Sequence, residues 1–231
     1  MTLRVEELAK TIDHPLQTPA PTPADVVRLC DEACAHHFAA VCVGAHCVRL
    51  AAERLRGCDI KVAGVIAAAD RKAKAALAVR CLSAGAAEIE IALGTEEMLA
   101  GAFRSARNDL AAVVRALRTA NVNTGRGYVL VKVAVDCDRL DDARKRLACL
   151  IVDDVDADFV EAVTRSPGIA ALRELELFRD GLPERVGVKV TVPVARAEEA
   201  EELVTAGVAR IGTPHAVAMM RSAPTLVEVV R

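Results

Sequence analysis

The run Val-Gly-Val-Lys-Val-Thr-Val at positions 186–192 decides the fold class, because it has the composition of a strand that is buried on both faces. It is short, rich in β-branched residues and almost wholly apolar. The run Tyr-Val-Leu-Val-Lys-Val-Ala-Val at 128–135 has the same character. Each run holds one lysine, Lys189 or Lys132, and an ammonium buried without a partner costs several kcal/mol or gives up its proton. The two lysines therefore predict a paired or reactive group inside the protein.

Segments with strand and helix character alternate along the whole chain. The expected strands are 11–14, 39–43, 61–66, 88–92, 129–135, 159–163, 187–192 and 210–212. Apolar residues at helical spacing predict helices at 24–34, 72–83, 97–119, 140–152 and 197–205. Eight alternating units predict a parallel sheet closed into one α/β domain, a TIM (β/α)8 barrel over residues 1–231. An open doubly wound sheet is the alternative, but no Gly-x-Gly-x-x-Gly follows the first strand.

Local signals mark the ends of several helices. Thr22 followed by Pro23 predicts a helix start, with a side-chain cap and a proline at the first helical position. Gly85 and Gly207 are expected helix ends, since each precedes a strand within a few residues. The basic stretch 144–146 lies among charges of both signs and predicts a solvated helix face.

Composition excludes several classes of function. The net charge of −2 gives no indication of nucleic-acid or anionic-membrane binding. No apolar stretch approaches the length of a membrane span, and the amphipathic, acidic start is unlike a signal peptide, so a cytoplasmic location is expected. No organic cofactor is indicated.

A segment rich in cysteine and histidine raises the question of zinc. It contains Cys30, Cys34, His36, His37, Cys42, His46 and Cys47. It lacks a tight CxxC pair and divides into a helix end, a strand and the next helix start, whereas zinc ligands must converge. The cysteines are therefore expected to be reduced, mostly buried thiols, and no metal site is predicted.

Polar residues gather near the carboxyl ends of the expected strands, where barrel active sites lie. The expected catalytic residues are Glu161, Lys189, Lys132, Glu90 and Asp13. The expected substrate-binding residues are Cys42, Asp136, Thr191, Thr213 and His215. A purely structural network of ion pairs is the alternative, although buried ion pairs rarely add stability and are often tied to function.

Seven segments, in order and across nearly the whole chain, resemble the class I, Schiff-base type of deoxyribose-phosphate aldolase. They are Thr-Ile-Asp-His-Pro-Leu (11–16), Phe-Ala-Ala-Val-Cys-Val (38–43), Gly-Ala-Ala-Glu-Ile-Glu (85–90), Val-Leu-Val-Lys-Val (129–133), Ala-Asp-Phe-Val (157–160), Val-Gly-Val-Lys (186–189) and Ala-Gly-Val-Ala-Arg-Ile-Gly-Thr (206–213). The resemblance implies a TIM barrel and a tendency to form homo-oligomers.

The resemblance also assigns roles, and one of them is broken. In that family a lysine after Ala-Asp-Phe-Val forms the imine with the substrate carbonyl, and this chain has Glu161 there. Lys189 matches the second active-site lysine, which lowers the pKa of the nucleophile. Glu90 stands where the family has a proton-relaying aspartate. The other family residues are kept as Lys132, Asp13 and Cys42.

The phosphate site of the family is altered as well. The family holds phosphate with the backbone N–H groups of glycine-rich turns after the seventh and eighth strands. This chain has Thr-Val-Pro at 191–193 and Gly-Thr-Pro-His at 212–215, and each proline removes an N–H donor. The loop Ala-Ala-Ala-Asp at 67–70 also lacks the family's Phe-Pro-x-Gly element. Deoxyribose 5-phosphate is therefore not the expected substrate.

Three functions remain open from the sequence. In the first, a divergent enzyme performs aldol, isomerase or dehydratase chemistry on a small non-phosphorylated carbonyl compound, with Glu161 as base and the two lysines stabilising negative charge. In the second, Lys189 or Lys132 has become the Schiff-base nucleophile. In the third, the barrel is a non-catalytic homologue that binds a metabolite or acts as a scaffold.

Overall fold

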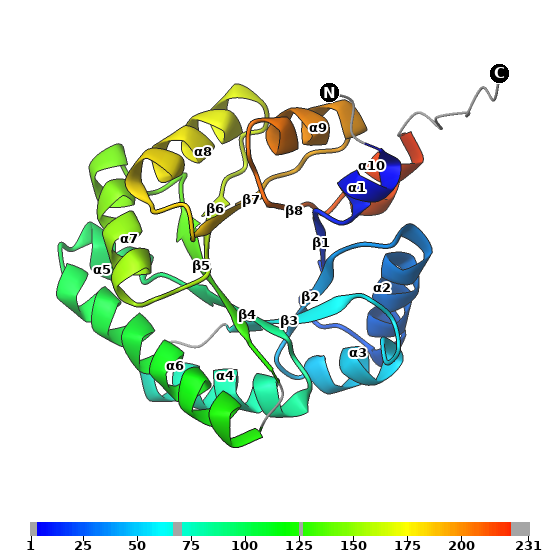
Figure 1. Ribbon diagram of the computed structural model, residues 1–231, viewed down its shortest axis with the longest axis horizontal. Coiled ribbons are helices and arrows are strands. Elements are labelled where there is room, and N and C mark those ends of the chain that lie inside the picture. The colour runs from blue at the N-terminus through cyan, green and yellow to red at the C-terminus, as the bar shows by residue number, and fades with distance from the viewer. Residues whose placement is uncertain (1–3, 67–70, 125–126, 223–231) are drawn as a thin grey trace.

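The computed structural model describes residues 4–66, 71–124 and 127–222, and within them eight parallel strands close into a barrel (Figure 1). Each strand pairs with the next along the chain, and the eighth pairs with the first. The strands are β1 (Ile12–Pro15), β2 (Ala40–Gly44), β3 (Lys61–Ile66), β4 (Glu88–Ala92), β5 (Leu130–Asp136), β6 (Phe159–Val163), β7 (Gly187–Thr191) and β8 (Arg210–Gly212). The predicted TIM barrel is confirmed, and every predicted strand end lies within one residue of the observed one.

The described helices surround the ring of strands (Figure 1). They are α1 (Val5–Ala9), α2 (Pro23–His36), α3 (Val48–Arg54), α4 (Arg71–Ala84), α5 (Thr95–Leu99), α6 (Phe103–Thr124), α7 (Asp142–Asp154), α8 (Ile169–Gly181), α9 (Ala197–Thr205) and α10 (Ala216–Ser222). The predicted cap of α2 is present: the Thr22 hydroxyl oxygen accepts a hydrogen bond from the Asp25 amide at 3.3 Å. None of the helices in the described ranges is long and apolar enough to cross a membrane.

Two sequence predictions about helices were wrong. The single helix expected at 97–119 is two helices, because the chain turns at Gly101, whose φ of +73° ends α5 before α6 begins. The basic stretch 144–146 is not a fully solvated face. Lys145 is buried, and its Nζ atom lies 2.5 Å from Oε1 of Glu174 on α8, an ion pair between two neighbouring helices.

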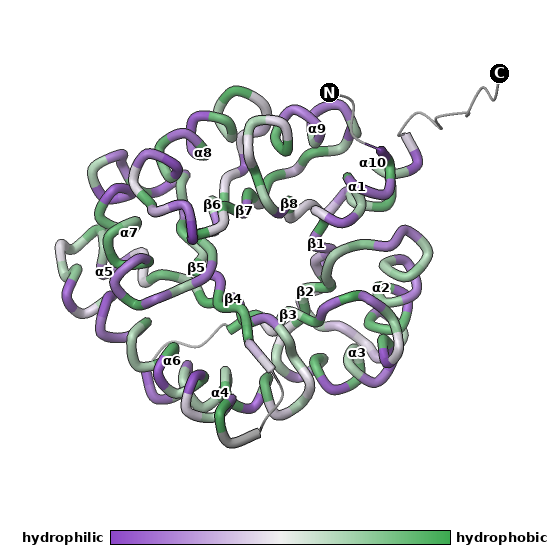
Figure 2. The backbone as a smooth tube through the Cα atoms, viewed as in Figure 1, coloured by the Kyte–Doolittle hydropathy of each residue, from purple (hydrophilic) through white to green (hydrophobic). Residues whose placement is uncertain are grey.

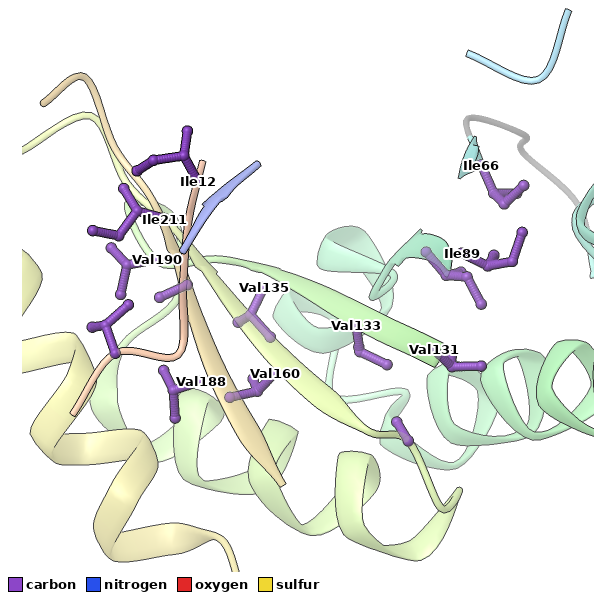
Figure 3. Packing of buried hydrophobic residues seen from close by; sticks show 14 of the residues in the cluster. Ile12, Ile66, Ile89, Val131, Val133, Val135, Val160, Val188, Val190 and Ile211 are labelled. Carbon is purple, nitrogen blue, oxygen red and sulfur yellow. The ribbon is translucent and has the colours of Figure 1, made fainter. Parts of the chain in front are cut away.

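Alternation along the strands separates two environments. One set of side chains forms an apolar layer between the barrel and the helices, and Figure 3 shows part of it on its strands. This layer includes Ile12, Ile89, Val131, Val133, Val135, Val160, Val188, Val190 and Ile211. The other set points into the barrel, because successive side chains of a strand face opposite sides. The hydropathy pattern of Figure 2 shows the strands as mainly hydrophobic, with the hydrophilic stretches spread over the outer helices. Asp13, Glu88, Glu90, Lys132, Glu161 and Lys189 are buried among these inward-facing residues, whereas Lys61 at the start of β3 is exposed.

Candidate functional site

Lys189 lies at the centre of the charged cluster inside the barrel. Its side chain is 2% exposed, and its Nζ atom lies 3.2 Å from Oδ2 of Asp13 and 3.3 Å from Oε1 of Glu161. It also contacts Oε1 of Glu90. Strands β1, β4, β6 and β7 therefore converge on one ammonium group. Cys42 joins from β2, because its Sγ donates to Glu90 at 3.2 Å.

Lys132 on β5 lies deeper and has its own carboxylates. The fully buried Nζ atom is 2.5 Å from Oδ2 of Asp13 and 2.6 Å from Oε2 of Glu88. Oε1 of Glu90 is 3.6 Å away. Asp13 and Glu90 thus face both lysines, so the two ammonium groups belong to one network.

Arg210 is a member of this network that the sequence analysis missed. From β8, its guanidinium lies 2.7 Å from Oδ1 of Asp13 and 3.2 Å from Oε1 of Glu88. The sequence did place Arg210 at the start of a predicted strand, two residues before Gly212. Residues two apart share one face of a strand, so Arg210 could have been expected on the same face as Gly212. Glu88 could have been found in the same way, because it lies two residues before Glu90 and therefore on the same face of its strand. Together, Arg210 and Glu88 complete the charged cluster.

The network keeps its lysines charged. Burial alone lowers the pKa of Lys189, but the acidic groups around it outweigh burial and raise that pKa well above the ordinary lysine value; in order of effect they are Cys42, Glu161, Glu90 and Asp13. Burial likewise opposes the Lys132 ammonium, and the attraction of Asp13 raises the pKa of Lys132 above its usual range. Both lysines are therefore ammonium ions at neutral pH.

The carboxylates divide into two groups. Burial raises the pKa of Asp13 and of Glu90, yet Lys189 and Lys132 outweigh it, so both pKa values lie below their ordinary range. For Glu161 burial wins and is reinforced by the charge of Glu90, so its pKa is raised even though Lys189 is close. Glu161 is the acid in the cluster whose proton affinity is tuned upward, as suits a group that exchanges protons near neutral pH.

The local geometry of Glu161 supports that role. Thr191 on β7 donates its hydroxyl to Oε1 of Glu161 at 2.5 Å, while Oε2 is buried without a hydrogen-bond partner. Gly212 on β8 makes room for this contact, because a Cβ atom at that position would meet Thr191 Oγ1 at 2.3 Å. One carboxyl oxygen is thus fixed, and the other has no protein partner.

A cavity of about 380 Å³ opens above the cluster. Its floor includes Asp13, Cys42, Glu90, Glu161, Lys189 and Thr191. Its wall includes the apolar residues Pro15, Leu16, Pro19, Pro21 and Val65. A cavity of this size suits a small molecule, and the floor offers acid–base groups and a fixed ammonium ion to it.

The structure places the remaining predicted residues away from the cavity lining. Thr213 is buried, and its hydroxyl donates to the Val194 carbonyl oxygen at 2.7 Å. His215 is exposed beyond β8, and its backbone N–H donates to Thr213 Oγ1 at 3.2 Å. Asp136 ends β5 and is half-buried. None of these three lines the cavity. The loop 67–70, expected to differ from the family, lies outside the described residues.

The cysteines and histidines considered for zinc are dispersed. Cys42 is in the barrel, whereas Cys34 on α2 lies against Cys58, with 3.3 Å between the Sγ atoms. Asp13, Cys42 and Glu90 do bring possible ligand atoms within 4.8 Å of one another. Oxygens of both carboxylates already contact the Lys189 ammonium, whose positive charge repels a metal cation. This donor set fits an ammonium ion better than a metal ion.

Comparison with known proteins finds relatives along nearly the full chain. A deoxyribose-phosphate aldolase from Treponema denticola is 31% identical over 220 residues, which cover 93% of this chain and 98% of the relative. One from Brevibacillus brevis is 33% identical over 221 residues, covering 94% and 96%. One from a Geobacillus species is 35% identical over 218 residues, covering 92% and 94%. No family model matches the chain.

Solved structures share the fold at lower identity. A putative deoxyribose-phosphate aldolase from Coccidioides immitis superposes with a TM-score of 0.82 at 24% identity, covering 95% of this chain and 86% of that one. A tetrameric deoxyribose phosphate aldolase from Aeropyrum pernix superposes with a TM-score of 0.79 at 24% identity, covering 97% and 94%. These likenesses agree with the closed barrel.

Proposed function

The chain belongs to the deoxyribose-phosphate aldolase family, and on that premise we propose that it is an aldolase-like lyase or isomerase that works by proton transfer through Glu161. Its substrate is a small, non-phosphorylated carbonyl compound. The observation that carries the proposal is the buried Glu161 carboxyl group, which has a raised pKa, lines the cavity and lies beside a permanent ammonium ion.

The proposed chemistry needs no covalent intermediate. The Glu161 carboxylate takes a proton from the carbon next to the substrate carbonyl, and the electron pair moves onto the carbonyl oxygen. The Lys189 ammonium, which also lines the cavity, stabilises the resulting enolate. Where the carbon that lost the proton carries a hydroxyl group, that hydroxyl gives its proton to the former carbonyl oxygen, and Glu161 returns its proton to the former carbonyl carbon. These two transfers move the carbonyl by one carbon and isomerise the compound. In the lyase direction, Glu161 takes the proton of a β-hydroxyl group, and the carbon–carbon bond breaks to give an aldehyde and the same kind of enolate.

Lys132, Glu90 and Asp13 act as positioning residues in this scheme. Asp13 and Glu90 favour the charged form of Lys189 and direct it between β4 and β6, and Lys132 holds Asp13 in place. A cation that is fixed before the reaction stabilises developing negative charge without a cost of reorganisation. A water molecule or a mobile lysine would lack that advantage.

The electrostatics disfavour the Schiff-base alternative. Imine formation requires a neutral amine, and the pKa values of both Lys189 and Lys132 are raised by their carboxylate neighbours. The substitution of the family lysine by Glu161 acts in the same direction. The remaining alternative, a non-catalytic binding protein, differs from the proposal in one measurable respect: it moves no protons.

Hydrogen–deuterium exchange tests the proposal directly. In D2O, wild-type protein is expected to exchange the hydrogens next to the carbonyl of dihydroxyacetone or 1-hydroxy-2-butanone, followed by proton NMR. Glu161→Gln is expected to slow this exchange by about 100-fold or more, the usual contribution of a positioned general base. The exposed control Glu198→Gln retains the wild-type rate. Equal rates in wild type and Glu161→Gln would overturn the assignment of the base, and no exchange in wild type would favour the binding protein.

Self-association is also part of the proposal. The Aeropyrum pernix relative is tetrameric, and the exposed Leu150 lines a groove between α6 and α7 together with Phe103 and Leu147. We expect light scattering after size-exclusion chromatography to give a homo-oligomer. A monomer mass at all protein concentrations would contradict this part alone.

A further inference from the structure

The three cations inside the barrel are all neutralised by carboxylates. Lys189 contacts three carboxylates, while Lys132 and Arg210 contact at least two each, as the distances above show. Within the described residues, four acids therefore face three cations: Asp13, Glu88, Glu90 and Glu161 against Lys132, Lys189 and Arg210. With Glu161 in its base form, an anionic ligand brought to the floor of the cavity would meet surplus negative charge and no unpaired cation among these groups, and such repulsion discriminates strongly against an anion.

The wall of the cavity is equally unsuited to an anion. Protein sites usually hold phosphate or carboxylate groups with backbone N–H donors or with arginine. Here the end of β1 contributes Pro15 and the segment after it contributes Pro19 and Pro21, and a proline has no N–H group. Leu16 and Val65 add hydrocarbon on the same wall. This wall can pack against a carbon chain, but its prolines cannot donate to an anionic group.

The polar groups that remain suit an uncharged ligand. Thr191 and Glu161 offer hydroxyl and carboxyl oxygens at the floor, and Thr18 and His46 offer hydrogen-bonding groups near the mouth. Such groups can bind hydroxyl and carbonyl oxygens without neutralising a charge. The volume of about 380 Å³ lies at the small end of the range for small-molecule sites.

We propose that the cavity selects an uncharged, short hydroxy-ketone or hydroxy-aldehyde, with its oxygens at the charged floor and its carbon chain against the Pro15, Leu16 and Val65 wall. The inference rests on the proposed function and specifies its substrate class. It excludes keto acids as well as sugar phosphates.

Two nearly isosteric probes test the charge preference. 1-Hydroxy-2-butanone and 2-oxobutanoate share the ketone and the ethyl group, and differ in a hydroxymethyl against a carboxylate. Binding is measured by NMR titration at pH 8, where imidazole side chains carry little charge. We expect the hydroxy-ketone to bind at least about tenfold more tightly than the keto acid, and dihydroxyacetone phosphate to bind no better than the keto acid. Equal or tighter binding of either anion, or no binding of the hydroxy-ketone, would overturn the proposal.

A matched pair of variants tests whether charge is the cause. Thr18 is exposed at the mouth of the cavity, whereas its neighbour Gln17 is exposed but does not line it. Thr18→Arg is expected to improve 2-oxobutanoate binding by about tenfold, the effect of one well-placed ion pair, and Gln17→Arg is expected to leave it unchanged. An equal gain in both variants would show that the added arginine attracts the anion without acting at the cavity. No gain in Thr18→Arg would show that charge is not what excludes the anion. Either result overturns the proposal that charge at the cavity excludes anions.

The two proposals fail in different ways. Selective binding of the hydroxy-ketone without hydrogen exchange would remove the proposed catalysis and leave the ligand class intact. Exchange on a keto acid that binds as well as the hydroxy-ketone would leave catalysis intact and remove the ligand class.

Discussion

The Nζ atom of Lys189 lies 3.3 Å from Oε1 of Glu161, and the two residues are direct partners in the pairing of β6 with β7. In the aldolases that this chain resembles, the position of Glu161 carries the imine-forming lysine. Two adjacent ammonium groups lower each other's pKa, whereas an acid beside a lysine stabilises the lysine's charge. On the proposed function, Glu161 therefore gives the site a permanent cation at Lys189 and a proton acceptor beside it.

Two carboxylates in this site are expected to affect stability with opposite signs. The pKa of Glu90 is lowered, so its charged form contributes stability that is present at neutral pH and lost as pH falls through its folded pKa. The pKa of Glu161 is raised, so its charged form costs stability above that pKa. We expect Glu90→Gln to lower the free energy of unfolding at pH 7 and Glu161→Gln to raise it.

The pH dependence checks the sign of both effects. Urea unfolding of each variant and of wild type is measured from pH 8 to pH 3. The Glu161→Gln difference should shrink as pH falls from the raised folded pKa of Glu161 to about 4, the usual pKa of an unfolded carboxyl group. The Glu90→Gln difference should persist to about that pH and shrink only below it, as pH falls towards the lowered folded pKa of Glu90. Destabilisation by Glu161→Gln at pH 7 would contradict a raised pKa for this residue.

Removing Lys132 should be costly to the fold. Lys132→Met leaves buried Glu88 with only Arg210 as a partner and takes one of the three cations from Asp13, and breaking a buried ion pair costs about 3–5 kcal/mol. Urea unfolding at pH 7 measures the loss. Lys10→Met is the matched control, since Lys10 pairs with Asp59 on the surface and should change the midpoint little. Equal effects of the two substitutions would show that the inner network does not support the barrel.

Gly212 is expected to be a positioning residue for Glu161. Gly212→Ala places a methyl group where it would clash with Thr191 Oγ1, so the hydrogen bond that fixes Glu161 must break. Hydrogen exchange into the substrate should slow by about tenfold, and Thr191→Val should slow it by a similar factor, since each removes one hydrogen bond. Gly94→Ala serves as the control, because Gly94 does not line the cavity and a methyl group there would meet the Glu97 side chain. A full rate in Gly212→Ala would show that the Thr191 contact is not needed.

Restoring the family lysine should not restore the family reaction. Glu161→Lys supplies the nucleophile, but Pro193 and Pro214 still lack the N–H donors of the family's phosphate turns. We expect no more than trace cleavage of deoxyribose 5-phosphate, measured as acetaldehyde release. Strong cleavage would show that phosphate binding survives without those turns.

Much of the fold could be predicted from the sequence, because buried parallel strands have a local signature. The strands around Lys132 and Lys189 were found by their β-branched composition, and the start of α2 by Thr22 and Pro23. The division of 97–119 into two helices was missed, although Gly101 offers the same local helix-end signal as Gly85 and Gly207. Lys145 was misplaced because its partner Glu174 lies on another helix.

The candidate site was predicted in part. The order of the strands predicted that Asp13, Glu90 and Glu161 lie close to Lys189. In the structure these three carboxylates contact the Lys189 ammonium group. Arg210 was missed because an arginine at a strand start resembles an exposed end, and only closure of β8 against β1 turns it toward Asp13. Thr213 and His215 were expected near the substrate from the family pattern, but their contacts lie outside the cavity.

The central claim is that this barrel has lost imine chemistry and has not moved it to another lysine. Incubation with acetaldehyde or 1-hydroxy-2-butanone, reduction with borohydride and intact-mass analysis test it most directly, since borohydride converts an imine into a stable secondary amine. Glu161→Lys serves as the positive control, because its new amine lies next to the Lys189 ammonium, which lowers its pKa. We predict an unchanged mass for the wild-type protein and a reduced adduct on the variant. A wild-type adduct that maps to Lys189 or Lys132 would contradict the claim.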